Sequence, residues 1–312
     1  MEVLLSCGEV VSRMMLPPLF YNEIFVMASF KSCIIKSLPV ENMVAAAEQA
    51  VQINPANAPP VVTIITSLIL EPQHLALLTS KYWGASGVSL TVSFLDNPSV
   101  SLRRKILQHA NSWGEFSNVK FVETAADGQV RIARTPRSGY WSYLGTDILQ
   151  IPKNQPTMNL DSFSDRTSDS EFTRVVRHEV GHVLGAPHEH FRRGIVSKID
   201  PSKAIAYFGR TQGWSPQMVQ QQVLTPLEES SLLGTEFSDE ESIMTYSLPG
   251  SITYDGKPII GGKDINANDR AFAAKVYPLV TVPPPQSGSI NLSVYLDKKQ
   301  ISLKFPEGWS VV

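Results

Sequence analysis

Cysteine is scarce in this chain of 312 residues, since Cys7 and Cys33 are the only two. A disulfide framework is therefore excluded for residues 34–312, which fits a reducing compartment. Basic residues are not in excess, because the formal net charge is −2, and this argues against nucleic acid as a partner. The longest apolar run, 59–70, is too short to span a bilayer, so we expect no membrane partner either.

Composition and proline content divide the chain into four predicted segments. Hydrophobic residues make up 43% and charged residues 18%, as in an ordinary globular protein. We expect 1–60 to be an N-terminal extension or pro-like segment and 61–280 to be the compact domain. Residues 281–288 predict a Pro-rich linker, and 289–312 predict a C-terminal β-hairpin tail. The N-terminal residues lack the basic-then-apolar order of a secretory signal, so we expect a cytoplasmic or non-classically secreted protein.

The hydrophobic periodicity predicts mixed α and β structure, with strands preceding a long helix. Strands are predicted at 88–94, 119–123, 129–134 and 147–151, and shorter helices at 40–51 and 102–113. The long helix begins at a predicted capping box, in which Ser168 and Glu171 satisfy each other's backbone groups. It ends at Gly185, because glycine readily adopts the left-handed conformation of a helix C-terminus.

Histidine is rare, yet four of the six histidines lie between 178 and 190. His178 and His182 are four residues apart, so they lie on one helix face and can bind one zinc ion. Glu179 lies about 100° around the helix, where it can face a water molecule without ligating the metal. Gly185 lets the chain turn so that His188 becomes the third ligand. Three protein ligands leave the fourth position of zinc for water, as in catalytic sites.

Two other interpretations of this cluster remain. The first is a structural zinc site, which usually has four Cys or His ligands. Against it, no cysteine lies nearby in the sequence, and His190 is too close to His188 to be an easy fourth ligand. A catalytically silent, zinc-containing peptide-binding module is the alternative function. His190 itself either lines the cleft or is solvated.

At these residues the chain resembles a metzincin zinc endopeptidase of the astacin group. The zinc motif continues into Glu189 directly after His188, as it does in that group. The segment 242–246 is similar to the Ser-Ile-Met-x-Tyr Met-turn, and 139–145 is similar to the segment upstream of the active-site helix, with Tyr140 where a cysteine is usual. The resemblance covers residues 80–280.

The resemblance implies a two-lobed, zincin-like α+β catalytic domain with a twisted mixed sheet, an active-site helix and a Met-turn. It implies a zinc-dependent metalloendopeptidase with one catalytic ion, Glu179 as general base and a peptide or protein substrate; we expect a monomer. Met244 is implied as a hydrophobic floor under the zinc, and Tyr246 as a displaceable ligand that stabilises the oxyanion. From the residues alone, Met244 fits core filler, and Tyr246 fits a packed aromatic at a turn.

Two further residues keep two interpretations each. In the family, the glutamate after the third histidine often binds the new N-terminus after propeptide removal, so Glu189 is expected to do so or to pair with Arg192 or Arg193. Cys33 or Cys7 either blocks the zinc as a thiolate in a latent form or is a small apolar residue with a free thiol.

Overall fold

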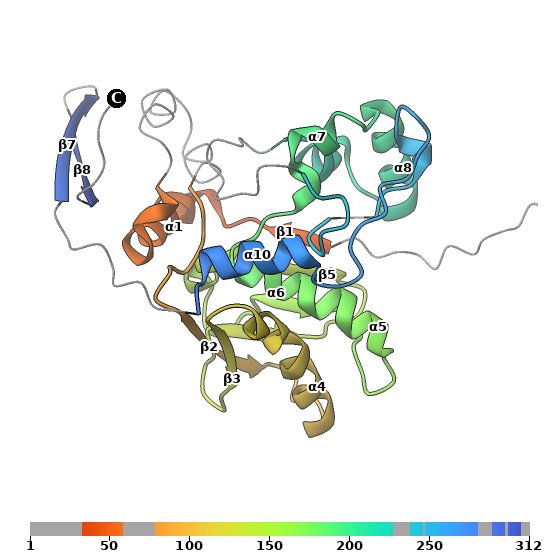
Figure 1. Ribbon diagram of the computed structural model, residues 1–312, viewed down its shortest axis with the longest axis horizontal. Coiled ribbons are helices and arrows are strands. Elements are labelled where there is room, and N and C mark those ends of the chain that lie inside the picture. Colours follow the sequence, from red (N-terminus) through yellow and green to blue (C-terminus); the bar gives the residue numbers. More distant parts are fainter. Residues whose placement is uncertain are drawn as a thin grey trace, which may run out of the picture. The chain divides into compact units, whose positions relative to one another are not determined.

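The computed structural model describes residues 33–58, 79–226, 238–245, 247–279, 289–296 and 299–306 (Figure 1). The chain divides into two units, of which Met1–Phe30 lies outside the described residues and Lys31–Val312 holds every element below. Cys7 and Tyr246 also lie outside the described residues. Among those that are described, no helix has the length and apolar character needed to cross a membrane.

A six-stranded mixed sheet forms the first part of the domain, with the strand order β1-β5-β6-β4-β2-β3. Its strands are β1 (Cys33–Lys36), β2 (Val88–Phe94), β3 (Val119–Glu123), β4 (Val130–Ala133), β5 (Tyr140–Tyr143) and β6 (Met158–Leu160). β5 pairs antiparallel with β6, whereas the pairs β1–β5, β2–β3, β2–β4 and β4–β6 are parallel. The predicted mixed sheet is thus confirmed.

The predicted strand at 147–151 is wrong, because this segment lies in the 3-10 helix η3 (Gly145–Gln150). The backbone turns at Gly145, which has a φ of +47°. A Cβ added there would lie 1.9 Å from the carbonyl oxygen of Lys81. The next amide, that of Thr146, donates to the same oxygen at 3.0 Å. This close approach of a distant segment, invisible in the local periodicity, bends the chain into a helical turn.

The helices packed with the sheet are α4 (Val100–Ala110), η2 (Asn111–Glu115) and a continuous stretch made of α5 (Asp169–Glu171), the π-helical turn η4 (Phe172–Val176) and α6 (Arg177–Val183). α4 buries Leu102, Ile106 and Ala110 on the predicted face. α6 contacts both α4 and β5. Helix α6 is therefore held between helix α4 and strand β5, and β5 also pairs with β1.

The predicted capping box at the start of this helix is only half formed in the described structure. The Ser168 hydroxyl accepts from the Glu171 amide at 3.3 Å, as predicted. The Glu171 carboxylate does not return the bond, because it accepts from the Arg174 guanidinium and, at 3.1 Å, from the Tyr140 hydroxyl. Tyr140, which stands where the family has a cysteine, thus anchors the helix start by a hydrogen bond.

Beyond Gly185 the described chain up to 279 is helical and irregular, with two isolated β-bridges. Its elements are η5 (Glu189–Phe191), α7 (Arg193–Val196), α8 (Pro201–Gln212), α9 (Pro216–Val219), η6 (Gln220–Leu224), η8 (Gly250–Ile252) and α10 (Ala267–Val276). Asp200 and Ser215 cap α8 and α9, each ahead of a proline at the first helical position. One hydrophobic core cluster includes residues from both this part and the sheet part.

The remaining elements lie near the two chain ends. α1 (Val40–Ile53) and η1 (Pro55–Asn57) follow β1, and β7 (Ser289–Leu296) pairs antiparallel with β8 (Lys299–Pro306) as the predicted hairpin. α1 contacts η3, and a small apolar cluster of Leu38, Ala46 and Ile151 joins them. The predicted domain boundaries stay predictions.

Lys81 and Asp147 form a buried ion pair, with Nζ and Oδ1 3.8 Å apart. Burial raises the pKa of Asp147 to about 6 and lowers the pKa of Lys81. We expect Asp147→Ala to lower the free energy of unfolding by about 3–5 kcal/mol, because it leaves a buried ammonium without its partner. Chemical denaturation measures this change. The double variant Lys81→Met/Asp147→Leu is expected to recover most of the loss, and an equally unstable double variant would contradict the explanation.

Candidate metal centre

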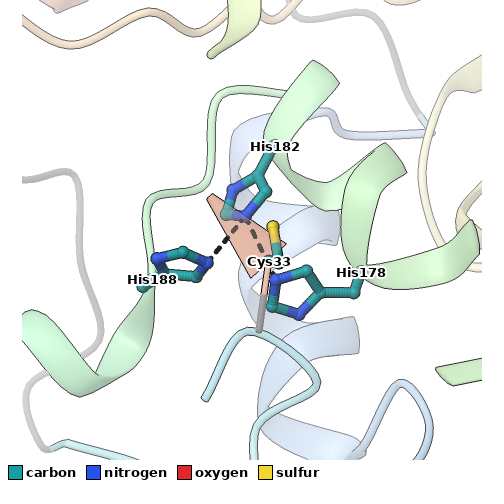
Figure 2. A group of neighbouring side chains, drawn as sticks. All are labelled: Cys33, His178, His182 and His188. Carbon is teal, nitrogen blue, oxygen red and sulfur yellow. Dashed lines mark hydrogen bonds between the residues drawn. The ribbon is translucent and has the colours of Figure 1, made fainter. Parts of the chain in front are cut away.

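Helix α6 and the turn after it bring the three predicted histidine ligands together. Gly185 has a φ of +96°, and its amide donates to the carbonyl of His182 at 2.8 Å. The Ala186 amide donates to the carbonyl of Gly181 at 3.0 Å. This pair of bonds is a Schellman motif. It ends the helix and reverses the chain, so that His188 returns to the face that carries His178 and His182 (Figure 2).

The Nε2 atoms of the three histidines converge on one point. His182 Nε2 lies 3.1 Å from His178 Nε2 and 3.0 Å from His188 Nε2. Tetrahedral zinc with Zn–N bonds of about 2.0–2.1 Å places its ligand nitrogens about 3.3 Å apart. The observed separations are close to that value, and all three side chains are buried.

Backbone carbonyls fix the orientation of two of these rings. The Nδ1–H of His178 donates to the Ile243 carbonyl at 2.6 Å, and that of His182 donates to the Ala186 carbonyl at 2.8 Å. In a neutral imidazole the other nitrogen is then an unprotonated acceptor. Burial lowers the pKa of His178 to about 4 and that of His182 well below its usual range. Nitrogen lone pairs that face each other in this way fit a bound cation, since neither can donate to the other.

Cys33 completes the cluster from a distant part of the sequence. Its Sγ and the ring nitrogens of the three histidines all lie within 4.8 Å of one another. Figure 2 shows the sulfur of β1 directed at the rings. The register Cys33↔Tyr140 between β1 and β5 places it there. No cysteine lies near these histidines in the sequence, and strand pairing rather than sequence proximity brings the thiol to them, as the interpretation of Cys33 as a blocking residue requires.

Glu179 is completely buried next to this cluster, with an exposed fraction of 0%. Burial raises the pKa of Glu179 to about 8, while a hydrogen bond with Cys33 and the charge of Arg174 act to lower it. The thiol of Cys33 lies beside the histidine nitrogens, and the buried carboxylate directly follows His178 in the same helix.

The Met-turn packs directly beneath the active-site helix. A Cβ added to Gly181 would lie 2.3 Å from Met244 Sδ, so any larger residue there would push the Met244 side chain out of its place. The Met244 carbonyl accepts from the Glu189 amide at 3.0 Å. Sequence reasoning missed Asp269, whose carboxylate accepts from the Ser242 hydroxyl at 2.6 Å and from the Ile243 amide at 3.0 Å. Asp269 lies in the first turn of α10, so these bonds tie the Met-turn to that helix. The sequence signal that could have drawn attention to Asp269 was its capping box with Asn266.

His190 is buried, so its interpretation as a solvated side chain is wrong. Its Nε2–H donates to the Gln222 carbonyl at 2.9 Å, and its ring stacks on that of His188 with centroids 4.8 Å apart. Burial lowers the pKa of His190 to about 3, which keeps the ring neutral. His190 therefore supports the third predicted ligand from behind.

Glu189 lines a cavity of about 60 Å³, together with Arg192, Asp239 and Asp269. Its carboxylate accepts from the Asp239 amide at 3.2 Å and lies 3.8 Å from Arg192 Nε. Burial raises the pKa of Glu189 to about 7, against the lowering effect of Arg192. The pairing with Arg192 is thus observed, and the binding of a new N-terminus stays a prediction.

Comparison with known proteins identifies the class. No protein-family model and no curated protein matches the sequence. A structure of myroilysin matches with a TM-score of 0.61 and 33% identity, over 64% of this chain and 97% of that one. A crystal structure of myroilysin matches with a TM-score of 0.50 and 34% identity, over 64% and 86% of the two chains. A hatching enzyme zinc-protease from the medaka fish Oryzias latipes matches at 17% identity, over 62% and 92%, with a TM-score of 0.43.

The α+β fold, the histidine cluster and the myroilysin matches define a zinc protease of the metzincin class. Within that class the chain belongs to the astacin-like family, as the sequence motifs predicted, and it is a metalloendopeptidase.

Proposed function

We propose that the chain hydrolyses peptide bonds with one zinc ion held by His178, His182 and His188 and with Glu179 as the general base. The observation that carries the proposal is the convergence of three histidine Nε2 atoms beside a fully buried carboxylate. Zinc, when bound, polarises the scissile carbonyl and acidifies the attacking water. The carbonyls of Ile243 and Ala186 hold two of the rings with Nε2 unprotonated, so the ligand set is preorganised.

Glu179 performs the proton transfers in this proposal. Its carboxylate takes the proton of the attacking water and passes it to the leaving amine. Met244 packs under the helix and keeps the floor of the site apolar. Tyr246, which lies outside the described residues, is proposed to stabilise the oxyanion.

The substrate is proposed to bind as an added strand. β5 is bonded on one side to β6 and on the other to β1. When β1 leaves, the free edge of β5 offers unpaired amides and carbonyls to an extended peptide. That edge leads directly to the histidine cluster, because Cys33 in β1 reaches it from this position.

The full chain is proposed to be a latent form of the enzyme. Cys33 supplies a fourth ligand to zinc as a thiolate, which closes the position that water needs. β1 at the same time covers the strand edge that the substrate needs. The position of Cys33 beside the histidine nitrogens and the pairing of β1 with β5 support the interpretation of Cys33 as a blocking residue rather than as a simple apolar side chain.

Metal removal tests the proposed ligand set. In the Cys33→Ala chain, which lacks the blocking thiol, we expect dialysis against a chelator to abolish peptide hydrolysis, and one equivalent of zinc per chain to restore it. His182→Ala is expected to lose stoichiometric zinc, as measured by elemental analysis, because it removes the central nitrogen of the cluster. His109→Ala is the matched control, since its ring stacks on Phe172 away from the cluster. Full zinc binding by His182→Ala would contradict the assignment.

A further inference from the structure

Strand β1 presents a basic side chain to the ring of Trp141 in β5, which packs against the ring of Tyr143. Lys36 Nζ lies 5.1 Å from the centroid of the Trp141 ring, within the roughly 6 Å over which a ring face attracts a cation. The rings of Trp141 and Tyr143 pack edge to face, with centroids 6.1 Å apart. Both are half-buried. We call Trp141 and Tyr143 the aromatic pair.

The strand register relates the aromatic pair to the metal centre. Cys33 lies opposite Tyr140, and Lys36 lies opposite Tyr143. Side chains alternate between the two faces of a strand. Cys33 and Lys36 are three positions apart, so one side chain points to the histidine cluster and the other to the opposite face, which carries the aromatic pair. A strand held at this edge therefore places one side chain at the metal and another, three residues away, on the aromatic pair.

We propose that the aromatic pair is a substrate subsite for a basic side chain, located three residues from the residue that lies at the metal centre. The proposal rests on the proposed peptidase function of the same cleft. Lys36 occupies the subsite in the described structure, and its side chain stays exposed while the ammonium faces the Trp141 ring. A long side chain with a cationic tip fits this arrangement, because its stem packs on the rings and its charge stays in water.

Binding without turnover tests the subsite separately from catalysis. The protein is the full chain carrying Cys33→Ala and Glu179→Gln, loaded with zinc. The probes are a fluorescent peptide with the sequence of residues 32–38 and the same peptide with norleucine in place of lysine. Competition from the chain's own β1 affects both probes equally, so the ratio of their dissociation constants is the readout.

We expect the lysine peptide to bind about 2–5-fold more tightly than the norleucine peptide, the equivalent of about 0.5–1 kcal/mol. Trp141→Leu is expected to bring the ratio to 1, because leucine offers no ring face. Trp141→Phe should keep part of the preference, and its melting temperature checks that the sheet edge is intact. Equal binding of the two peptides, or no binding of either, overturns the subsite.

A hydrolysis assay then separates this proposal from the proposed function. Quenched peptides carrying lysine at successive positions around the scissile bond are offered to the Cys33→Ala chain. We expect lysine at one position, three positions from the residue at the metal, to raise kcat/KM by about the 2–5-fold factor expected for binding. Trp141→Leu is expected to remove that gain. Lysine-dependent binding without hydrolysis of any peptide would leave the subsite standing and reject the peptidase function.

Discussion

Glu179→Gln is expected to lower the kcat of peptide hydrolysis by about 10²–10⁴-fold, the range that a positioned general base contributes. The amide has nearly the same shape as the carboxylate but cannot accept the proton of the attacking water. The side chain is buried beside the three histidines and does not belong to their converging nitrogens. Zinc content, measured by elemental analysis, is therefore expected to stay at one equivalent.

The measurement uses the Cys33→Ala background, so that the thiol does not mask the rates. Glu115→Gln is the matched control, because the same chemical change is made at an exposed carboxylate of η2. It should leave kcat unchanged. A Glu179→Gln variant that keeps the full rate would reject the role of the base, and one that loses its zinc would assign Glu179 to the ligand set instead.

Cys33→Ala is expected to raise the hydrolytic activity of the full chain at least about tenfold, which corresponds to about 1.4 kcal/mol of lost blocking free energy. In the proposed latent form, the thiolate holds the fourth position of zinc while β1 covers the edge of β5. Without the sulfur, the short strand is held at its edge mainly by backbone hydrogen bonds. Substrate then competes for both the metal and the strand edge.

Cobalt substitution gives this prediction a readout that does not depend on activity. A thiolate bound to Co²⁺ produces a charge-transfer absorption band, which we expect in the unaltered chain and not in Cys33→Ala. Cys7→Ala removes the other cysteine and should change neither the band nor the rate. An absent band in the unaltered chain, or an unchanged rate in Cys33→Ala, would contradict the proposed latency.

Much of the site was predictable because its spacing is local. Residues four apart on a helix share a face, so His178 and His182 had to lie together once the helix formed. Gly185 is the left-handed residue of the Schellman motif that ends the helix. The chain reverses there, so His188, three positions later, returns to the same helix face. The strand 88–94 was an equally local pattern, and the structure confirms it.

The errors share one physical cause, which is contact between segments far apart in the sequence. The helical turn at 145–150 forms because the Lys81 backbone approaches Gly145. His190 is buried because η6 supplies a carbonyl to it. Asp269 holds the Met-turn from another helix. The sequence shows no period or spacing that predicts these partners, although the spacing of Asn266 and Asp269 is that of a capping box.

The sequence by itself determined the chemistry of this protein: a helix with two imidazoles on one face, a carboxylate beside them and a third imidazole after a glycine turn. Backbone periodicity is enough to specify such an arrangement. Only the tertiary structure decided which other side chains lie next to these groups. Parallel pairing of β1 with β5 brings Cys33 to the histidines and Lys36 to the aromatic pair. Strand pairing depends on which edge remains open after the sheet has assembled, and that is a property of the whole fold.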